Sequence, residues 1–319
     1  MPSLNLVVLS VALALLSVAA LAAEQEETAT PNAHLCPADD GHKVAKGNEF
    51  REQDNPSLAI ICYEEALEHD PKDASAMIGI SAVHFSLQNF SGAQAKLEQL
   101  LHHHPDHAEA NHMMADVYRV RHELSLHGGH QGSRQEEIKA MMGEVVHYYK
   151  KAIEANPKDD LPYASLGSYY LSLGDFEAAI STLEEGLEAN EESNPVLLGL
   201  ADTYKHKEEY ETCLHFAQKA LKLDSMSAYP YGIIGECALF SNQPQRSVNA
   251  LQKACQLDPG NHHFLHLLVT AVRSNVAVEP AEALRVLKRL DLEQYHDAEV
   301  TELFHELMVE LSDRANKEL

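Results

Sequence analysis

Small and large apolar residues recur at fixed offsets along most of this sequence. In residues 160–193 these positions hold Tyr163, Leu166, Gly167, Tyr170, Ala179 and Leu183. About 34 residues further on, the same offsets hold Leu197, Leu200, Ala201, Tyr204, Cys213 and Ala217, and one more step gives Tyr231, Ile234, Gly235, Ala238, Ser247 and Leu251. A constant period of this kind predicts a repeated structural unit built from two paired helices.

Residue size at these offsets predicts how the two helices of a pair pack. Small residues on the first helices are expected to face small residues on the second helices, so that the backbones approach closely. The first-helix members are Gly47, Ala115, Gly167, Ala201 and Gly235, and the second-helix members are Ala59, Ala93, Ala179, Cys213 and Ser247. Large residues then fill the space towards the next pair; they are Tyr63, Leu97, Tyr149, Leu183 and Leu251. Each pair therefore buries its apolar face only against its neighbours.

This pattern resembles the tetratricopeptide-repeat family, in which a proline follows the second helix of each repeat. The corresponding prolines in this sequence are Pro71, Pro105, Pro157 and Pro259. The resemblance implies an all-α fold, a right-handed superhelical α-solenoid of about seven helix-turn-helix repeats. The array is expected over residues 40–295, with repeats beginning near residues 40, 74, 108, 160, 194, 228 and 262. The third repeat carries an insertion at residues 121–137, and residues 296–319 are predicted to form a capping helix and tail.

The composition fits a helical array and limits its partners. The chain has 319 residues, 45% of them apolar, with 6% aromatic residues and no Trp. Asp and Glu number 49 against 24 Lys and Arg, so the surface repels nucleic-acid phosphates and acidic lipids. Nucleic acid is therefore not an expected partner.

The N-terminus predicts export. Residues 1–23 are apolar and uncharged, and Ala20 and Ala22 suit cleavage that leaves Ala23 as the mature N-terminus. We expect a signal peptide at residues 1–22, an acidic, polar leader at residues 23–39, and a location in the secretory-pathway lumen, outside the cell or in a bacterial periplasm. An uncleaved anchor is the alternative, and only then would a membrane be a partner.

Five cysteines are an odd number for an exported chain: Cys36, Cys62, Cys213, Cys237 and Cys255. None forms a CxxC pair, and several fall where a small buried residue is expected. Buried thiols are the favoured interpretation, while a Cys36–Cys62 or a Cys237–Cys255 disulfide stays open.

A histidine-rich stretch, HHHPDH at residues 102–107, has two interpretations. In the repeat frame it is the end of a second helix, a Pro-containing turn and the start of the next first helix. The alternative is a zinc-binding or pH-responsive module, because neutral imidazole is a common metal ligand. Its candidate ligands are His102, His103, His104, His107, His127 and His130.

The family resemblance implies a protein or peptide ligand in a groove lined by the first helices. The candidate groove residues are Asn48, Arg51, Ile78, Phe85, His112, Asp116, Arg119, Leu171, Leu198, Lys205, Tyr229, Leu239 and Arg273. No nucleophile with a paired base, phosphate-binding loop or convergent carboxylate pair stands out in the sequence. We therefore expect a non-catalytic scaffold without a cofactor that assists assembly or folding of a partner complex.

Overall fold

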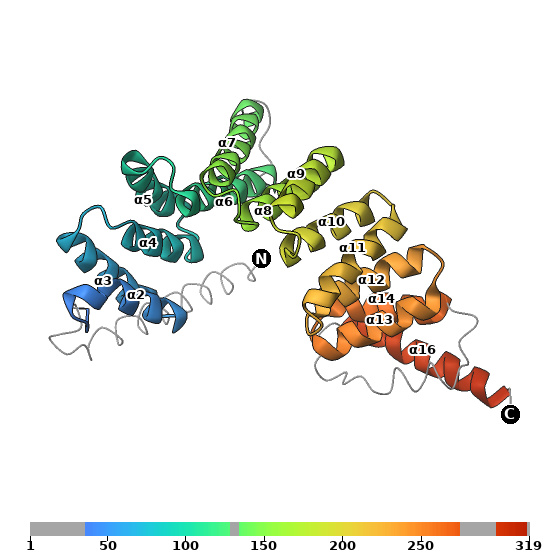
Figure 1. Cartoon of the computed structure of the whole chain (residues 1–319). Coiled ribbons are helices and arrows are strands. Elements are labelled where there is room, and N and C mark those ends of the chain that lie inside the picture. Colours follow the sequence, from blue (N-terminus) through green and yellow to red (C-terminus); the bar gives the residue numbers. More distant parts are fainter. Residues whose placement is uncertain (1–35, 128–133, 275–297, 318–319) are drawn as a thin grey trace, which may run out of the picture. The chain divides into compact units, whose positions relative to one another are not determined.

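The computed structural model of the chain describes residues 36–127, 134–274 and 298–317 (Figure 1). Within those residues all regular secondary structure is helical, which confirms the predicted all-α fold. The predicted signal peptide, most of the leader and the second helix of the seventh repeat lie outside the described residues.

Helices come in antiparallel pairs, here called hairpins, after a short 3₁₀ helix, η1 (Asp40–His42). The first helices are α2 (Lys43–Glu52), α4 (Ala74–Ser86), α6 (Ala108–His127), α8 (Leu161–Ser172), α10 (Asn194–His206), α12 (Ala228–Phe240) and α14 (His262–Ser274). The second helices are α3 (Pro56–His69), α5 (Phe90–His103), α7 (Arg134–Ala155), α9 (Phe176–Ala189), α11 (Tyr210–Leu223) and α13 (Pro244–Leu257). The last described helix is α16 (Ala298–Lys317).

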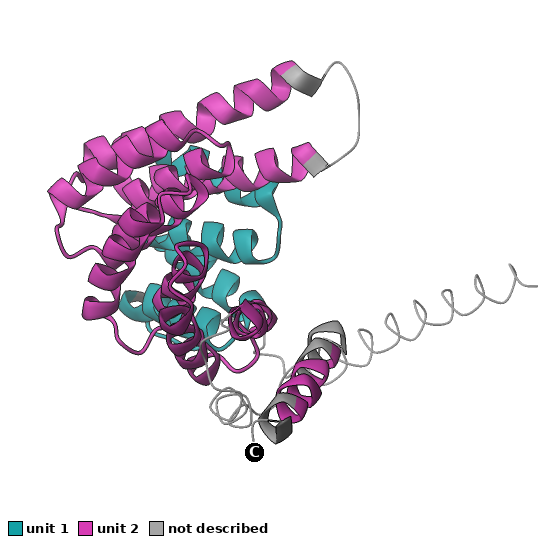
Figure 2. Ribbon diagram, turned by 90° about the vertical axis from the view of Figure 1, so that its right-hand side faces the viewer, with its two compact units in different colours: residues 1–105 teal, residues 106–319 magenta. Residues whose placement is uncertain are grey.

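The chain divides into two compact units (Figure 2). Unit 1 ends at Pro105 and contains η1 and α2 to α5, whereas unit 2 begins at Asp106 and contains α6 to α16. In unit 2, each first helix from α8 to α12 contacts its own second helix and the first helix of the next hairpin. The unit boundary falls within the histidine-rich stretch.

Each described hairpin turn uses one residue in the left-handed backbone region. These residues are Asp54, Gln88, Gly174, Glu208 and Asn242. In the second hairpin, the N–H of Asn89 donates to the carbonyl oxygen of His84 at 2.8 Å and closes α4. The Asn89 side chain then accepts from the N–H of Gly92 and caps α5. Adjacent residues therefore end one helix and begin the next.

Glycines on the first helices make room for large side chains on the second helices. A Cβ atom at Gly167 or Gly199 would overlap with the side chain of Leu183, which is fully buried. This differs from the expectation that Gly167 faces only a small residue, because the missing Cβ supplies the volume that a leucine occupies. Gly235 faces both a large and a small residue of the second helix. A Cβ atom added there would overlap with Leu251, and its carbonyl oxygen accepts a hydrogen bond from the Ser247 hydroxyl at 2.6 Å.

The insertion in the third hairpin is largely helical rather than a loop. Helices α6 and α7 have 20 and 22 residues, whereas α2 has 10 and α3 has 14. The extra residues lengthen both helices, which pack along each other. Leu124, Ala140 and Met141 line a cavity between them. Only residues 128–133 of the insertion lie outside the described part.

Helix α16 packs against α14 at the C-terminal end of unit 2. Its residues Leu307 and Leu311 are buried in the same apolar cluster as Leu265 and Leu268 of α14. In the part of the chain that the structure describes, no helix combines the length and the apolar character needed to cross a membrane.

Two disulfides correct the expectation of buried thiols for four of the five cysteines, and one of them is the Cys36–Cys62 pair that the sequence left open. Cys36 bonds to Cys62 of α3, and Cys213 of α11 bonds to Cys237 of α12. The alternative Cys237–Cys255 pair is wrong, because Cys237 faces α11 across the hairpin junction. Cys255 is buried and takes part in neither disulfide.

We expect Gly167→Ala to lower the free energy of unfolding by about 1–3 kcal/mol, because the added methyl group overlaps Leu183. The matched control is Gly143→Ala in α7, where an added Cβ meets nothing within 4 Å. That change should instead stabilise the protein by about 0.5–1 kcal/mol. Urea unfolding of both variants checks the pair, and an equal effect at the two sites would contradict the packing described here.

Replacing both Cys213 and Cys237 by Ala should lower the free energy of unfolding by about 3 kcal/mol, because the bond closes a loop between residues 24 apart. Denaturation with and without dithiothreitol measures this effect. Dithiothreitol also reduces the Cys36–Cys62 bond, so the wild-type protein should lose stability on reduction and approach the variant measured under the same reducing conditions. If the variant and the oxidised wild type have the same denaturation midpoint, the Cys213–Cys237 bond does not stabilise the protein.

Candidate functional site

A cavity of about 380 Å³ lies on unit 2 where three successive first helices meet. We call it the first-helix cavity, and it is lined by Asp116, Arg119 and Glu123 of α6, by Leu161, Ala164, Ser165, Ser168, Tyr169 and Ser172 of α8, and by Pro195 of α10. The structure thus brings two predicted groove residues, Asp116 and Arg119, to the wall of one cavity. Three serines and three charged residues are among its ten lining residues.

The charged wall of the first-helix cavity is held in place by hydrogen bonds. The hydroxyl of Tyr149, on α7, donates to Asp116 Oδ1 at 2.6 Å. Arg119 donates to Glu123 at 2.9 Å and lies 3.5 Å from Asp116. Burial, followed by the nearby Asp116 carboxylate, raises the pKa of Tyr149, so this side chain stays a donor at physiological pH. These bonds fix the side chains before any ligand arrives.

His112 of α6 contacts two residues of this wall, Ser165 and Asp116. Its Nε2 atom lies 3.1 Å from Ser165 Oγ and 3.8 Å from Asp116 Oδ2. Both partners therefore share one ring nitrogen. In a nucleophile relay the acid instead bonds to the ring nitrogen opposite the serine, so the geometry at His112 suits hydrogen bonding rather than serine activation.

A second charged cluster joins α10 to α12. Lys205 lies 3.0 Å from Asp202 and 3.2 Å from Glu236, and the Tyr229 hydroxyl donates to Asp202. Burial alone would lower the pKa of Lys205, but the carboxylates of Asp202 and Glu236 outweigh it and raise that pKa. Lys205 and Tyr229 are predicted groove residues, and the structure places them in direct contact with the same carboxylate.

Several predicted apolar groove residues pack against the protein itself. Ile78 is only 8% exposed, and the ring of Phe85 meets Phe90 edge-on at 5.6 Å. Leu198 and Leu239 pack against neighbouring apolar clusters of unit 2. Ile78 is therefore closed to a ligand, whereas Phe85, Leu198 and Leu239 stay partly exposed.

The remaining predicted groove residues are dispersed. Asn48 accepts a hydrogen bond from the Tyr63 hydroxyl at 2.7 Å, and Arg51 is exposed on unit 1. Leu171 is partly exposed on α8, and Arg273 lies 3.4 Å from Glu306 of α16. These four residues take no part in the hydrogen bonds and ion pairs described for the clusters around Arg119 and Lys205.

The histidine-rich stretch forms a helix end and a helix start. His102 and His103 are exposed in the last turn of α5, and the N–H of His104 closes that helix on Leu100. His107 accepts from the N–H of Ala110 through Nδ1 at 3.3 Å and so caps α6. This use of one imidazole as a helix cap has no sequence signature.

Zinc binding by this stretch stays a prediction. Among the described side chains, no three His, Cys, Asp or Glu residues lie close enough together to hold a metal ion. Two predicted ligands, His130 and the side chain of His127, fall outside that part of the chain.

One buried histidine was not among the predicted groove or metal residues. His122 is 2% exposed, and its Nδ1 atom lies 3.3 Å from the hydroxyl of Tyr169, a residue that also lines the first-helix cavity. Burial lowers the pKa of His122, and the adjacent Glu123 carboxylate offsets part of that effect. In the sequence, His122 lies within the insertion at residues 121–137, outside the repeat pattern, so that pattern did not predict its burial.

Comparison with known proteins agrees with this architecture. Two segments, residues 50–118 and 148–181, match the tetratricopeptide repeat. These two segments carry the tetratricopeptide repeat. A curated relative, the general transcriptional corepressor trfA of Dictyostelium discoideum, is 28% identical over 89 residues. That match covers 28% of this chain and only 6% of the corepressor, so the similarity concerns a small part of that protein.

Solved repeat proteins share the fold at low sequence identity. PilW, a widely conserved type IV pilus biogenesis factor, has a TM-score of 0.58 and 19% identity over 72% of this chain and 100% of its own. A tetratricopeptide repeat protein of Parabacteroides merdae gives 0.55 and 14%, covering 85% and 98%. A thermophilic repeat protein of Thermus thermophilus gives 0.50 and 17%, covering 67% and 99%. At these identities the likeness concerns the fold.

We expect His122 to make the protein less stable in acid. Its folded pKa lies below the ordinary value of about 6.5, so the unfolded chain binds a proton first and stability falls as the pH drops below that value. His122→Asn keeps an acceptor for Tyr169 and should reduce the loss of stability between pH 7.5 and 5. His147→Asn, at an exposed position on α7, is the control. Equal pH dependence in wild type and His122→Asn would contradict the assignment.

Proposed function

We propose that this chain is an exported, non-catalytic scaffold that holds a segment of another protein against the first helices of unit 2. The first-helix cavity carries the proposal, because α6, α8 and α10 together form one recess with fixed charged and hydroxyl groups. Such preformed polar groups set the orientation of a ligand and contribute specificity.

Charge favours a ligand segment that contains Lys or Arg. Lys205 lies between Asp202 and Glu236, so this cluster keeps one excess negative charge. The whole chain has a formal net charge of −25 at pH 7, which also attracts cationic partners. A basic, extended segment fits this surface better than an acidic one.

The two disulfides support export, because disulfides persist in oxidising compartments and are rare in the cytosol. The apolar N-terminal stretch of the sequence points the same way. A role in the assembly or folding of a partner complex remains part of the proposal, and PilW, a pilus biogenesis factor, offers a precedent on the same fold.

The experiment blocks the cavity without touching the core. Ser168 is exposed on α8 and lines the cavity, so Ser168→Tyr should fill it and lower partner recovery from the exporting compartment at least ten-fold. Ser57→Tyr, at an exposed position on α3, is the matched control and should bind like the wild type.

A photo-reactive residue at position 168 identifies the bound segment by mass spectrometry. We expect cross-links to a segment that contains Lys or Arg. Equal partner recovery by Ser168→Tyr and Ser57→Tyr, or cross-links only to acidic segments, would contradict the proposal.

A further inference from the structure

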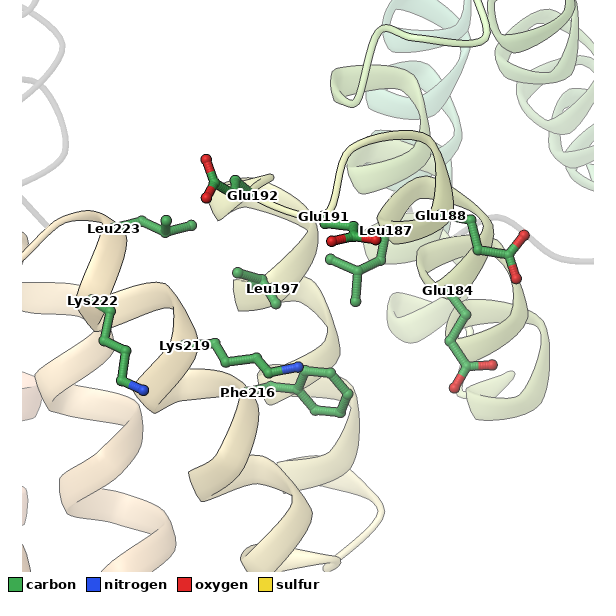
Figure 3. A pocket seen from close by; sticks show the side chains of 10 residues that line it. All are labelled: Glu184, Leu187, Glu188, Glu191, Glu192, Leu197, Phe216, Lys219, Lys222 and Leu223. Atoms are coloured by element: carbon green, nitrogen blue, oxygen red, sulfur yellow. The ribbon is translucent and has the colours of Figure 1, made fainter.

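A second recess lies on the opposite helices of the same hairpins. This second-helix groove has a volume of about 820 Å³, against about 380 Å³ for the first-helix cavity, and runs between α9 and α11 (Figure 3). Leu187 of α9 and Phe216 of α11 contribute apolar surface to it. Figure 3 shows Leu187 between the glutamates of α9 and the lysines of α11.

The two walls of the second-helix groove carry opposite charges. Glu184 and Glu188 of α9 line one wall, together with two glutamates of the turn that follows α9. Lys219 and Lys222 of α11 line the other wall. In this fully described stretch, neither lysine lies within ion-pair distance of the glutamates across the groove. Lys219 instead lies 5.6 Å from the ring centre of Phe216. The charges on both walls therefore remain available to a molecule that enters between them.

The segregation of charge belongs to this hairpin junction and not to the repeat in general. One repeat earlier, the equivalent wall positions are Lys150 and Glu154 on α7, and they line a smaller cavity of about 410 Å³. One repeat later, the positions equivalent to Glu184 and Glu188 hold Gln218 and Lys222 on α11. Only the α9–α11 junction of these three has an acidic wall opposite a basic wall.

We infer that the second-helix groove is a docking site for an amphipathic helix of another protein, with Lys or Arg along one edge of its apolar face and Asp or Glu along the other. The apolar face would rest on Leu187 and Phe216, as in helix-in-groove recognition. The basic edge would meet the α9 glutamates, and the acidic edge would meet Lys219 and Lys222. A helix matching the 14 residues of α9 spans about 21 Å.

Charge arrangement, rather than total charge, is the specific requirement. A partner with mixed charges on both edges places like charges next to each other on each wall, which is unfavourable and opposes binding. Because the walls are exposed, we expect affinity to fall as the salt concentration rises.

Two synthetic helical peptides of identical composition test this inference. Both carry the same apolar face, but the first has Lys on one edge and Glu on the other, whereas the second alternates Lys and Glu along both edges. Fluorescence anisotropy should show that the segregated peptide binds the full chain at least ten-fold more tightly than the mixed peptide. Equal affinities would overturn the inference.

Charge reversal then locates the site. The Glu184→Lys, Glu188→Lys double variant should lose at least ten-fold in affinity for the segregated peptide, while Glu154→Lys, the position equivalent to Glu188 one repeat earlier, should not. Adding Lys219→Glu and Lys222→Glu exchanges the charges on the facing helices α9 and α11 and should restore binding at least in part, because the peptide can then lie in the opposite direction. Failure of this rescue in a variant with a wild-type circular dichroism spectrum would overturn the proposed site.

Two further measurements distinguish peptide docking in this groove from self-association and from binding in the first-helix cavity. Sedimentation of the chain alone tests a second copy as the occupant, and a dimer abolished by the Glu184→Lys, Glu188→Lys variant would replace the inference with self-association. Ser168→Tyr blocks the first-helix cavity and should leave peptide binding unchanged. Loss of peptide binding in Ser168→Tyr would place the peptide in the first-helix cavity and overturn docking in the second-helix groove.

Discussion

The close approach of two helices at positions without a Cβ atom determines the rest of this structure. Leu183 is fully buried because Gly167 in its own hairpin and Gly199 in the next one leave space for it. One side chain thereby sets the distance within a hairpin and between hairpins. Because each hairpin hides its apolar surface only against such neighbours, the polar groups of both helix layers stay at the surface, where they can meet ligands.

The same hairpins present different chemistry on their two helix layers. On the first helices, acidic and basic groups are already paired, as Lys205 is with Asp202 and Glu236, so a ligand meets a rigid surface with a small excess of negative charge. On the second helices of one junction, the opposite charges of Glu188 and Lys219 stand apart on facing walls. The first arrangement favours extended basic segments, and the second requires a partner that brings its own pair of charged edges.

The fold could be predicted because the same spacing of small and large apolar residues recurs in one repeat after another along the sequence. Of the candidate site, the sequence predicted the positions that follow from the repeat register, as for Asp116 and Lys205, which the structure places in charged clusters. It did not predict the burial of Ile78, which depends on neighbouring side chains. The pairing of Cys213 with Cys237 likewise depends on the contact between α11 and α12, and the burial of His122 depends on an insertion that lengthens helices.

The disulfide between α11 and α12 has a mechanical consequence. Helical repeat arrays can open from their ends by losing one neighbour contact at a time. Here one of those junctions is covalent, since it joins the second helix of one hairpin to the first helix of the next. Under tension, unfolding from one end must stop at this bond or disrupt both linked hairpins together. Helices α10 to α13 would therefore unfold as one cooperative unit.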